Sequence, residues 1–219
     1  MNRLNRLYAA LSALLSYPEQ ALLDALPEID GALQAQPLFR VQLDPLLRHL
    51  QAHQQDLIGL QEAYVARFDR SRQFSLYLFE HIHGESRERG EALLDLLHEY
   101  QRQGFEPDDR PGSMQEMPDH LPLFLEFLAQ LPPNDAARLL GDAVHVIALV
   151  GERLREAGDP YATVFEVLVD LSPVRPQPME DAPAHEMDAL LEMVGPGADG
   201  AEPLLKPDNG MVQTIRFHR

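Results

Sequence analysis

Apolar residues recur at intervals of three and four along most of this chain, and this spacing restricts the folds open to it. Near the start, five leucines fall on one helical face: Leu4, Leu7, Leu11, Leu14 and Leu15. Side chains spaced in this way share one face of an α-helix, whereas a strand would need strict alternation. Alternating patterns are almost absent, so the sequence predicts an all-α protein. About 45% of the 219 residues are hydrophobic, which is enough to bury a core.

The same periodicity predicts a single bundle of about nine helices. They span residues 4–15, 17–36, 43–53, 57–68, 74–82, 86–103, 121–130, 137–158 and 160–171. Ser16 and Glu19 are spaced as a capping box for the second helix, and Gly84 is suited to end the fifth. Gly90 falls in the first turns of the sixth helix, where glycine costs about 1 kcal/mol relative to alanine. We interpret Gly90 as a place where another helix approaches closely.

The character of the chain changes at Ser172. Seven of its 18 prolines lie beyond this point, together with the stretch "GPGADG". Such composition is typical of weakly structured chain. We therefore predict a helical domain at 1–171 and a flexible, acidic, proline-rich extension at 172–219. Within the extension we expect one short helix around 187–193, and we expect the closing "MVQTIRFHR" to dock on the helical domain.

Charge and composition exclude several classes of function. The chain carries 18 Lys and Arg against 35 Asp and Glu, a net charge of −17, which repels nucleic acid and anionic lipid and attracts basic partners. It contains no cysteine, so disulfides, iron–sulfur ligation and thiol catalysis by this chain are excluded. The first helix is amphipathic and not a continuous apolar run, and no stretch approaches the length of a membrane span. We expect a soluble, cytoplasmic protein.

Catalytic and metal-binding patterns are weak. Glu80 and His83 form a Glu-x-x-His pair, but a di-iron bundle would need a second such pair and two further inward glutamates. No His-Glu-x-x-His, glycine-rich phosphate loop or Gly-x-Ser-x-Gly motif occurs. The sequence therefore predicts neither an enzyme nor a metal protein. A metal-dependent helical-bundle enzyme using Glu80 and His83 is kept as an alternative.

One polar strip interrupts the apolar helix "LPLFLEFLAQ". At about 100° per residue, Asp119, Glu126 and Gln130 fall on the same side. In one interpretation Asp119 caps its own helix and Glu126 faces water. In the other, the strip is the acidic lip of a groove whose walls are Phe124, Leu125 and Phe127, and the groove takes an amphipathic helix with basic residues. The residues alone leave both interpretations open.

Taken together, these stretches resemble a known family. "YVARFDRSRQFSLYLFEHIHGESRERGEALLDLLHEYQRQGFEP", followed by "MPDHLPLFLEFLAQLP", is similar to the NarJ-type assembly chaperones of respiratory nitrate reductase, also called its delta subunit. They belong to the TorD/DmsD class of redox-enzyme maturation proteins. The resemblance covers about residues 4–170 in order and spacing, and the ending "TIRFHR" is also similar. The residues that carry it are Phe68-Asp69, Ser75 to Leu78, His83-Gly84, Arg87, Arg89-Gly90, Pro118 to Leu121 and Leu125 to Phe127.

The resemblance implies an all-helical, TorD-like, cytoplasmic chaperone that catalyses nothing. Such proteins bind the N-terminal segment of the catalytic (alpha) subunit of respiratory nitrate reductase. They hold the apoenzyme for insertion of the molybdopterin guanine dinucleotide cofactor and the iron–sulfur centres, before it docks at the membrane. The resemblance implies no stably bound cofactor, no nucleic acid and no membrane insertion, and it leaves a monomer or a dimer open.

By hypothesis, the client's N-terminal helix occupies a groove in this chain. The residues assigned to this client-peptide site are Tyr64, Phe68, Asp69, Tyr77, Arg87, Asp119, His120, Phe124, Glu126 and Phe127. His120 lies at the edge of the groove, where its protonation would tune affinity near neutral pH. Two further alternatives remain: a proofreading chaperone for the signal peptide of another molybdoenzyme, and a structural oligomer whose grooves are filled by its own copies.

Overall fold

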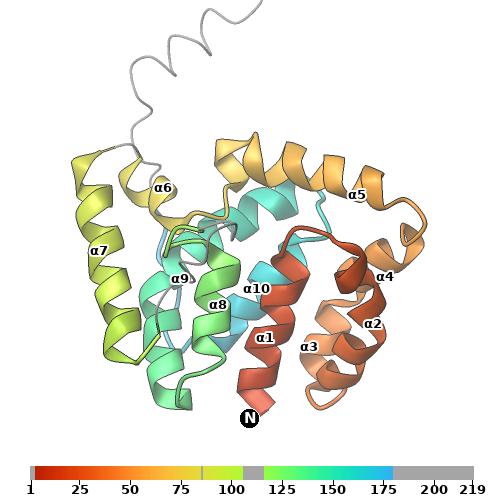
Figure 1. Cartoon of the computed structure of the whole chain (residues 1–219), viewed down its shortest axis with the longest axis horizontal. Coiled ribbons are helices and arrows are strands. Elements are labelled where there is room, and N and C mark those ends of the chain that lie inside the picture. The colour runs from red at the N-terminus through yellow and green to blue at the C-terminus, as the bar shows by residue number, and fades with distance from the viewer. Residues whose placement is uncertain (1–2, 85, 106–115, 180–219) are drawn as a thin grey trace, which may run out of the picture. The chain divides into compact units, whose positions relative to one another are not determined.

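The structure, a computed structural model, describes residues 3–84, 86–105 and 116–179, and over these ranges it confirms an all-α fold (Figure 1). The described helices are α1 (Arg3–Leu15), α2 (Gln20–Leu33), α3 (Pro37–Gln42), α4 (Asp44–Ala52), α5 (Leu57–Tyr64), α6 (Leu78–His83), α7 (Arg87–Arg102), α8 (Leu121–Leu128), α9 (Pro133–Glu156) and α10 (Ala162–Leu171). A π-helix at Val65–Asp69 continues α5, and a short 3₁₀ turn follows at Arg72–Phe74. None of the described helices is long and apolar enough to cross a membrane.

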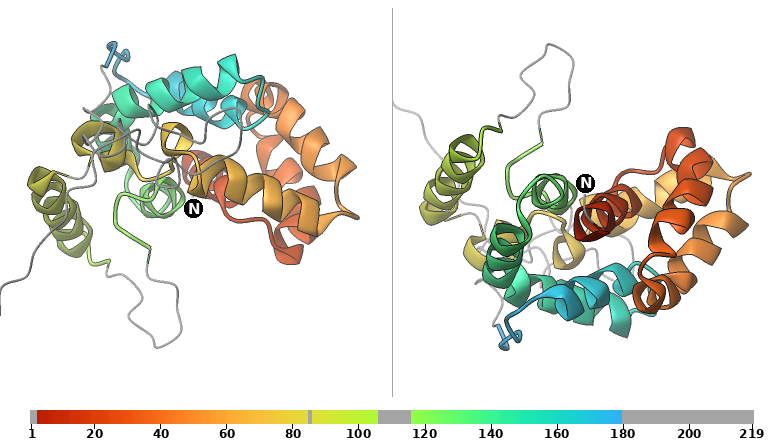
Figure 2. Two further views of the ribbon diagram at one scale, coloured as in Figure 1. Left: turned by 90° about the horizontal axis from the view of Figure 1, so that it is seen from above. Right: turned by 90° about the horizontal axis from the view of Figure 1, so that it is seen from below.

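Two helix pairs hold the core together. Helix α10 lies along α9, and α1 lies beside α8, as the two views in Figure 2 show. Leu11, Leu14 and Leu15 of α1 are completely buried, so the first helix is a central element of the core. Gly151 of α9 faces Phe165 of α10 so closely that a Cβ atom at Gly151 would lie 2.7 Å from the Cβ of Phe165.

The structure corrects the prediction for residues 16–42. Helix α2 begins at Gln20 with Glu19 as its N-cap, and not at residue 17 with Ser16 as its N-cap. The Ser16 hydroxyl instead donates a hydrogen bond to the Ser12 carbonyl (2.9 Å). The predicted capping box is therefore wrong. Helix α3 is a separate element that the prediction missed. It buries none of its six residues, so it carries no apolar stripe, and Leu38 and Val41 are exposed.

The prediction of a helix over 74–82 is wrong in its first half. Residues on either side of Tyr77 pair with a second segment instead: Leu121 N–H donates to the Leu76 carbonyl (2.8 Å), and Leu78 N–H donates to the Asp119 carbonyl (3.1 Å). Tyr77 and His120 thus form an isolated antiparallel bridge. Because these backbone groups are satisfied across the two segments, α6 starts only at Leu78.

Gly84 ends α6 with a positive φ of 57°, as predicted for a residue after a helix. The interpretation of Gly90 was wrong, because no atom of another described helix lies within 4 Å of where its Cβ would be. It is an exposed position on α7.

Residues 172–179 continue from α10 along α9. Gln177 N–H donates to the ring Nδ1 of His145 (2.9 Å), and a Cβ on Gly141 would lie 2.9 Å from Val174. The short helix expected around 187–193 and the docking of the last residues lie outside the described part of the chain. The boundary at residue 171 stays a prediction.

Candidate functional site

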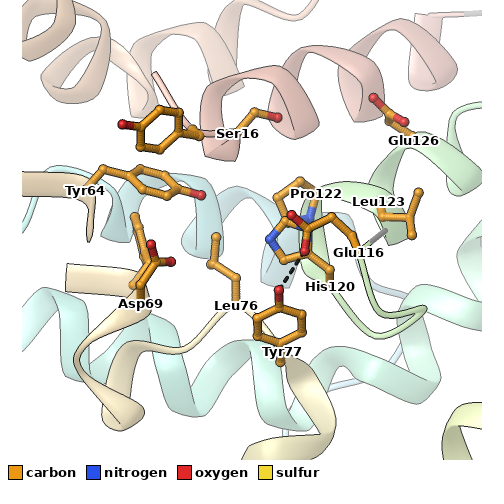
Figure 3. A pocket seen from close by; sticks show the side chains of 12 residues that line it. Ser16, Tyr64, Asp69, Leu76, Tyr77, Glu116, His120, Pro122, Leu123 and Glu126 are labelled. Carbon is orange, nitrogen blue, oxygen red and sulfur yellow. Dashed lines mark hydrogen bonds and ion pairs between the residues drawn. The ribbon is translucent and has the colours of Figure 1, made fainter. Parts of the chain in front are cut away.

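A pocket of about 380 Å³ lies where four segments meet (Figure 3). These are the end of α1, the turn from α5 into the π-helix, the extended stretch before α6, and the start of α8 with the residues that precede it. The pocket is lined by Ser16, Tyr17, Tyr64, Phe68, Asp69, Leu76, Tyr77, Glu116, His120, Pro122, Leu123 and Glu126.

The π-helix explains why three lining residues from one short segment, Tyr64, Phe68 and Asp69, form the same wall of the pocket. Arg70 N–H donates to the carbonyl of Val65, five residues earlier, at 3.0 Å. This wider turn brings residues i and i+5 onto the same side, whereas α-geometry would align i and i+4. Tyr64, Phe68 and Asp69 can therefore all line the pocket.

Aromatic rings form one side of the pocket. The ring centroids of Tyr64 and Phe68 are 4.8 Å apart, and those of Tyr17 and Tyr64 are 5.5 Å apart, both edge-to-face. The buried Tyr64 hydroxyl donates to the Leu15 carbonyl at the end of α1 (2.8 Å). Burial raises the pKa of Tyr64 far above its ordinary value, so this hydroxyl stays a neutral donor. The rings of Tyr17, Tyr64 and Phe68 thus form the apolar part of this wall.

Tyr77, Glu116 and His120 form the opposite side, as Figure 3 shows. The Tyr77 hydroxyl donates to Glu116 Oε2 (2.6 Å), and the rings of Tyr77 and His120 lie 5.1 Å apart. Burial raises the pKa of Tyr77, so it keeps the proton of that bond. Burial lowers the pKa of His120, partly opposed by the carboxylates of Glu116 and Asp69. Burial thus favours the neutral form of the His120 ring.

Among the described residues, those that line the pocket include three carboxylates and no lysine or arginine. Asp69 and Glu126 have no Lys or Arg within ion-pair distance among the described residues. Burial, followed by repulsion from Glu116, raises the pKa of Asp69. Arg67 on the same π-helix is not available, because it pairs with Asp159. Carboxylates beside aromatic faces suit a cationic side chain such as lysine or arginine.

Comparison with known proteins assigns the chain to a family. The profile of the nitrate reductase delta subunit family matches residues 32–166, a range that includes ten of the twelve lining residues. The chain belongs to this family. The resemblance inferred from the sequence is thereby confirmed.

Several members of the family are similar to the chain. It is 40% identical over 166 residues to the nitrate reductase molybdenum cofactor assembly chaperone NarJ of Escherichia coli K12, covering 74% of this chain and 67% of that protein. A probable chaperone of the same description, NarW of the same strain, is 42% identical over 116 residues, 53% of this chain and 48% of NarW. The probable NarJ of Bacillus subtilis 168 is 31% identical over 164 residues, 74% of this chain and 85% of that protein. These relatives are named as assembly chaperones and not as catalysts, which supports the prediction that the chain is not an enzyme.

Six of the ten residues assigned to the site from sequence line the pocket: Tyr64, Phe68, Asp69, Tyr77, His120 and Glu126. The other four do not. Phe124 and Phe127 are 3% and 5% exposed and belong to the core, and Asp119 is 0% exposed. Arg87 is exposed at the first position of α7.

The residues of the predicted polar strip therefore do not share one surface in the structure. Glu126 reaches the pocket, whereas Asp119 is buried. Phe124, Leu125 and Phe127 face the core, so the expected groove walls on this helix are replaced by Pro122 and Leu123. Asp119 does cap a helix, but not its own: it accepts from the Phe79 N–H of α6 (3.0 Å). The N-cap of α8 is His120, whose side chain makes no capping bond.

Six lining residues were missed from sequence: Ser16, Tyr17, Leu76, Glu116, Pro122 and Leu123. Tyr17 lies in the connection between α1 and α2, and both Tyr17 and Leu76 were placed inside predicted helices. Glu116 stands two residues before the Pro118-Asp119-His120 stretch that carries the resemblance, which is the one signal that could have found it.

The alternative metal site is not supported. Glu80 accepts a hydrogen bond from Ser75 Oγ (2.5 Å) and pairs with Arg89 (3.2 Å), while His83 lies 3.8 Å from Glu88. Within the described ranges, no group of three or more His, Asp or Glu side chains is placed to hold a metal ion.

Proposed function

We propose that this chain is a cytoplasmic maturation chaperone for respiratory nitrate reductase. Its client is the N-terminal segment of the catalytic subunit, and the pocket receives a lysine or arginine of that segment. While bound, the apoenzyme is held for insertion of the molybdopterin guanine dinucleotide cofactor and the iron–sulfur centres before membrane docking. The chaperone itself keeps no cofactor. The names of the family members support the client class.

The proposed preference for a lysine or arginine rests on the negative charge of the residues that line the pocket. Asp69, Glu116 and Glu126 bring three carboxylates to a cavity that also has aromatic walls. The net charge of −17 favours the approach of a basic segment over long range. A bound lysine or arginine would neutralise part of this charge and contact the rings of Tyr64 and Tyr77.

The size of the pocket limits what enters it. Pockets of roughly 300–1,000 Å³ hold a single small ligand, and at about 380 Å³ this one lies near the lower end of that range. We therefore propose that the client helix lies across the opening and inserts one or two side chains. This differs from the groove expected from sequence, into which the whole apolar side of a helix would fit.

Calorimetry with a synthetic peptide of the client's N-terminal segment tests the proposal. Asp69 and Glu126 are exposed carboxylates, so each pair with a peptide cation contributes about 0.2–1 kcal/mol. The double variant Asp69→Asn/Glu126→Gln should raise the Kd about two- to thirtyfold and reduce its salt dependence between 50 and 300 mM NaCl. Glu126→Arg should weaken binding more than Glu126→Gln.

The matched control is Glu28, an exposed acid on α2 that does not line the pocket. Glu28→Gln and Glu28→Arg should leave the Kd within twofold of the wild-type value. A wild-type Kd that is independent of salt, or equal losses at Glu28 and Glu126, would contradict the cationic part of the proposal. Absence of any peptide binding would contradict the proposal as a whole.

A further inference from the structure

Asp119 is the one fully buried acid among the residues that the structure describes. It belongs to a segment that borders the pocket, yet it is not a lining residue. Its carboxylate accepts the Phe79 N–H (3.0 Å), and its backbone carbonyl accepts the Leu78 N–H (3.1 Å). Asp119 therefore satisfies two donors in the first turn of α6 from a distant part of the chain.

These bonds act together with a third to hold two segments in register. Leu121 N–H donates to the Leu76 carbonyl (2.8 Å), which leaves Tyr77 directly opposite His120. In this register the two rings lie 5.1 Å apart, and the Tyr77 hydroxyl reaches Glu116. One whole side of the pocket thus depends on the pairing that Asp119 secures.

Arg89 extends the same network to α7. Its Nη2 lies 3.2 Å from Glu80 Oε1 and 3.9 Å from Asp119 Oδ2. Both partners are on Oδ2, which has one backbone donor and one nearby guanidinium, whereas Oδ1 has no hydrogen-bond partner among the described residues. A buried charge is unfavourable unless it is paired, so this arrangement depends on both partners.

We propose that Asp119 is a positioning residue: it holds Tyr77, Glu116 and His120 in the geometry that binds the client, and it does not contact the client. This inference rests on the proposed function of the pocket. It replaces the hypothesis, made from sequence, that Asp119 meets a basic residue of the client.

The test compares Asp119→Ala and Asp119→Asn in the full chain by two measurements. The first is amide hydrogen exchange of the free protein, followed at Phe79 and Leu121. Loss of a capping side chain typically shifts the local equilibrium about fivefold, so Asp119→Ala should speed exchange at these amides by about that factor. Asparagine is nearly as good a cap as aspartate, so Asp119→Asn should restore most of the protection.

The second measurement is the affinity for the client's N-terminal peptide at 50 and 300 mM NaCl. Asp119→Ala should weaken binding about fivefold at both salt concentrations, because a buried positioning group adds little to the salt dependence. Asp69→Asn, which removes a carboxylate of the pocket itself, should instead reduce the salt dependence. Asp56→Ala serves as the matched control: it removes a capping carboxylate that accepts the Gly59 N–H (3.0 Å) at the exposed start of α5, and it should leave the affinity unchanged.

Two outcomes overturn the inference. One is unchanged exchange at Phe79 in Asp119→Ala. The other is a loss of salt dependence in Asp119→Asn equal to that in Asp69→Asn, which would place Asp119 in contact with the client. If the wild-type protein binds no peptide, the proposed function fails, while the exchange measurement still decides whether Asp119 holds the pairing.

Discussion

The close contact between α9 and α10 gives a stability prediction whose size follows from the structure. In Gly151→Ala the new Cβ would lie 2.7 Å from the Cβ of Phe165. To reach 3.4 Å, the start of ordinary contact, the two atoms must separate by 0.7 Å (3.4 − 2.7). Both atoms are attached directly to helix backbones, so no side-chain rotation can relieve the contact. Overpacking of this kind costs about 1–3 kcal/mol.

Two exposed glycines supply the reference. Within the described part of the chain, and apart from the adjoining helix backbone, nothing lies within 4 Å of a Cβ at Gly31 in α2 or Gly90 in α7. Alanine in a helix is favoured over glycine by about 0.5–1 kcal/mol. Gly31→Ala and Gly90→Ala should therefore raise the free energy of unfolding by about this amount. Gly151→Ala gains the same helix propensity but also bears the clash, so it should be about 1–3 kcal/mol less stable than either reference variant.

Urea denaturation, followed by circular dichroism, measures all three variants. Equal m-values would show that the unfolded states are comparable, so that the midpoints report stability. If Gly151→Ala proved as stabilising as Gly90→Ala, α9 and α10 could not be packed as closely as described, and the reasoning would be refuted.

Two further predictions concern the walls of the pocket. Tyr64→Phe removes a buried hydrogen bond and leaves the Leu15 carbonyl without this partner. Urea denaturation should therefore show a free energy of unfolding lower by about 1–2 kcal/mol. An unchanged free energy of unfolding would mean that the bond is not made. The folded-state pKa of His120 lies below its ordinary value because of burial, so the unfolded state takes up more protons as pH falls through about 6.5. Between pH 7 and pH 5, urea midpoints should therefore show the wild type losing stability relative to His120→Gln. If the difference in stability between the two proteins were the same at both pH values, His120 would not be a buried neutral imidazole.

The helical domain was predictable where each helix packs one continuous face on the core. Helix α9 buries ten residues along 24 positions, and α10 buries five along ten, so their periodicity is strong. Helix α3 buries none and left no such signal. Part of the lining of the candidate pocket was predictable, because Tyr64, Phe68 and Tyr77 are large aromatic residues within periodic stretches. The placement of Asp119 was not, because it depends on contacts with α6 that no local pattern contains.

The pocket lies where the chain departs from regular α-helix. A helical projection at 100° per residue assumes uninterrupted α-geometry, and the chain departs from it twice, in the π-helix at Val65–Asp69 and in the bridge between Tyr77 and His120. Both departures supply lining residues of the pocket. Continuous α-helix through Tyr64 would turn Asp69 away from Tyr64, and continuous helix through Tyr77 would separate its hydroxyl from Glu116. Local irregularity is often found where a protein binds. Here it brings Asp69 and Tyr64 to one side of a small cavity and Glu116 and Tyr77 to the other. Regular helices with the same residues would not produce this arrangement.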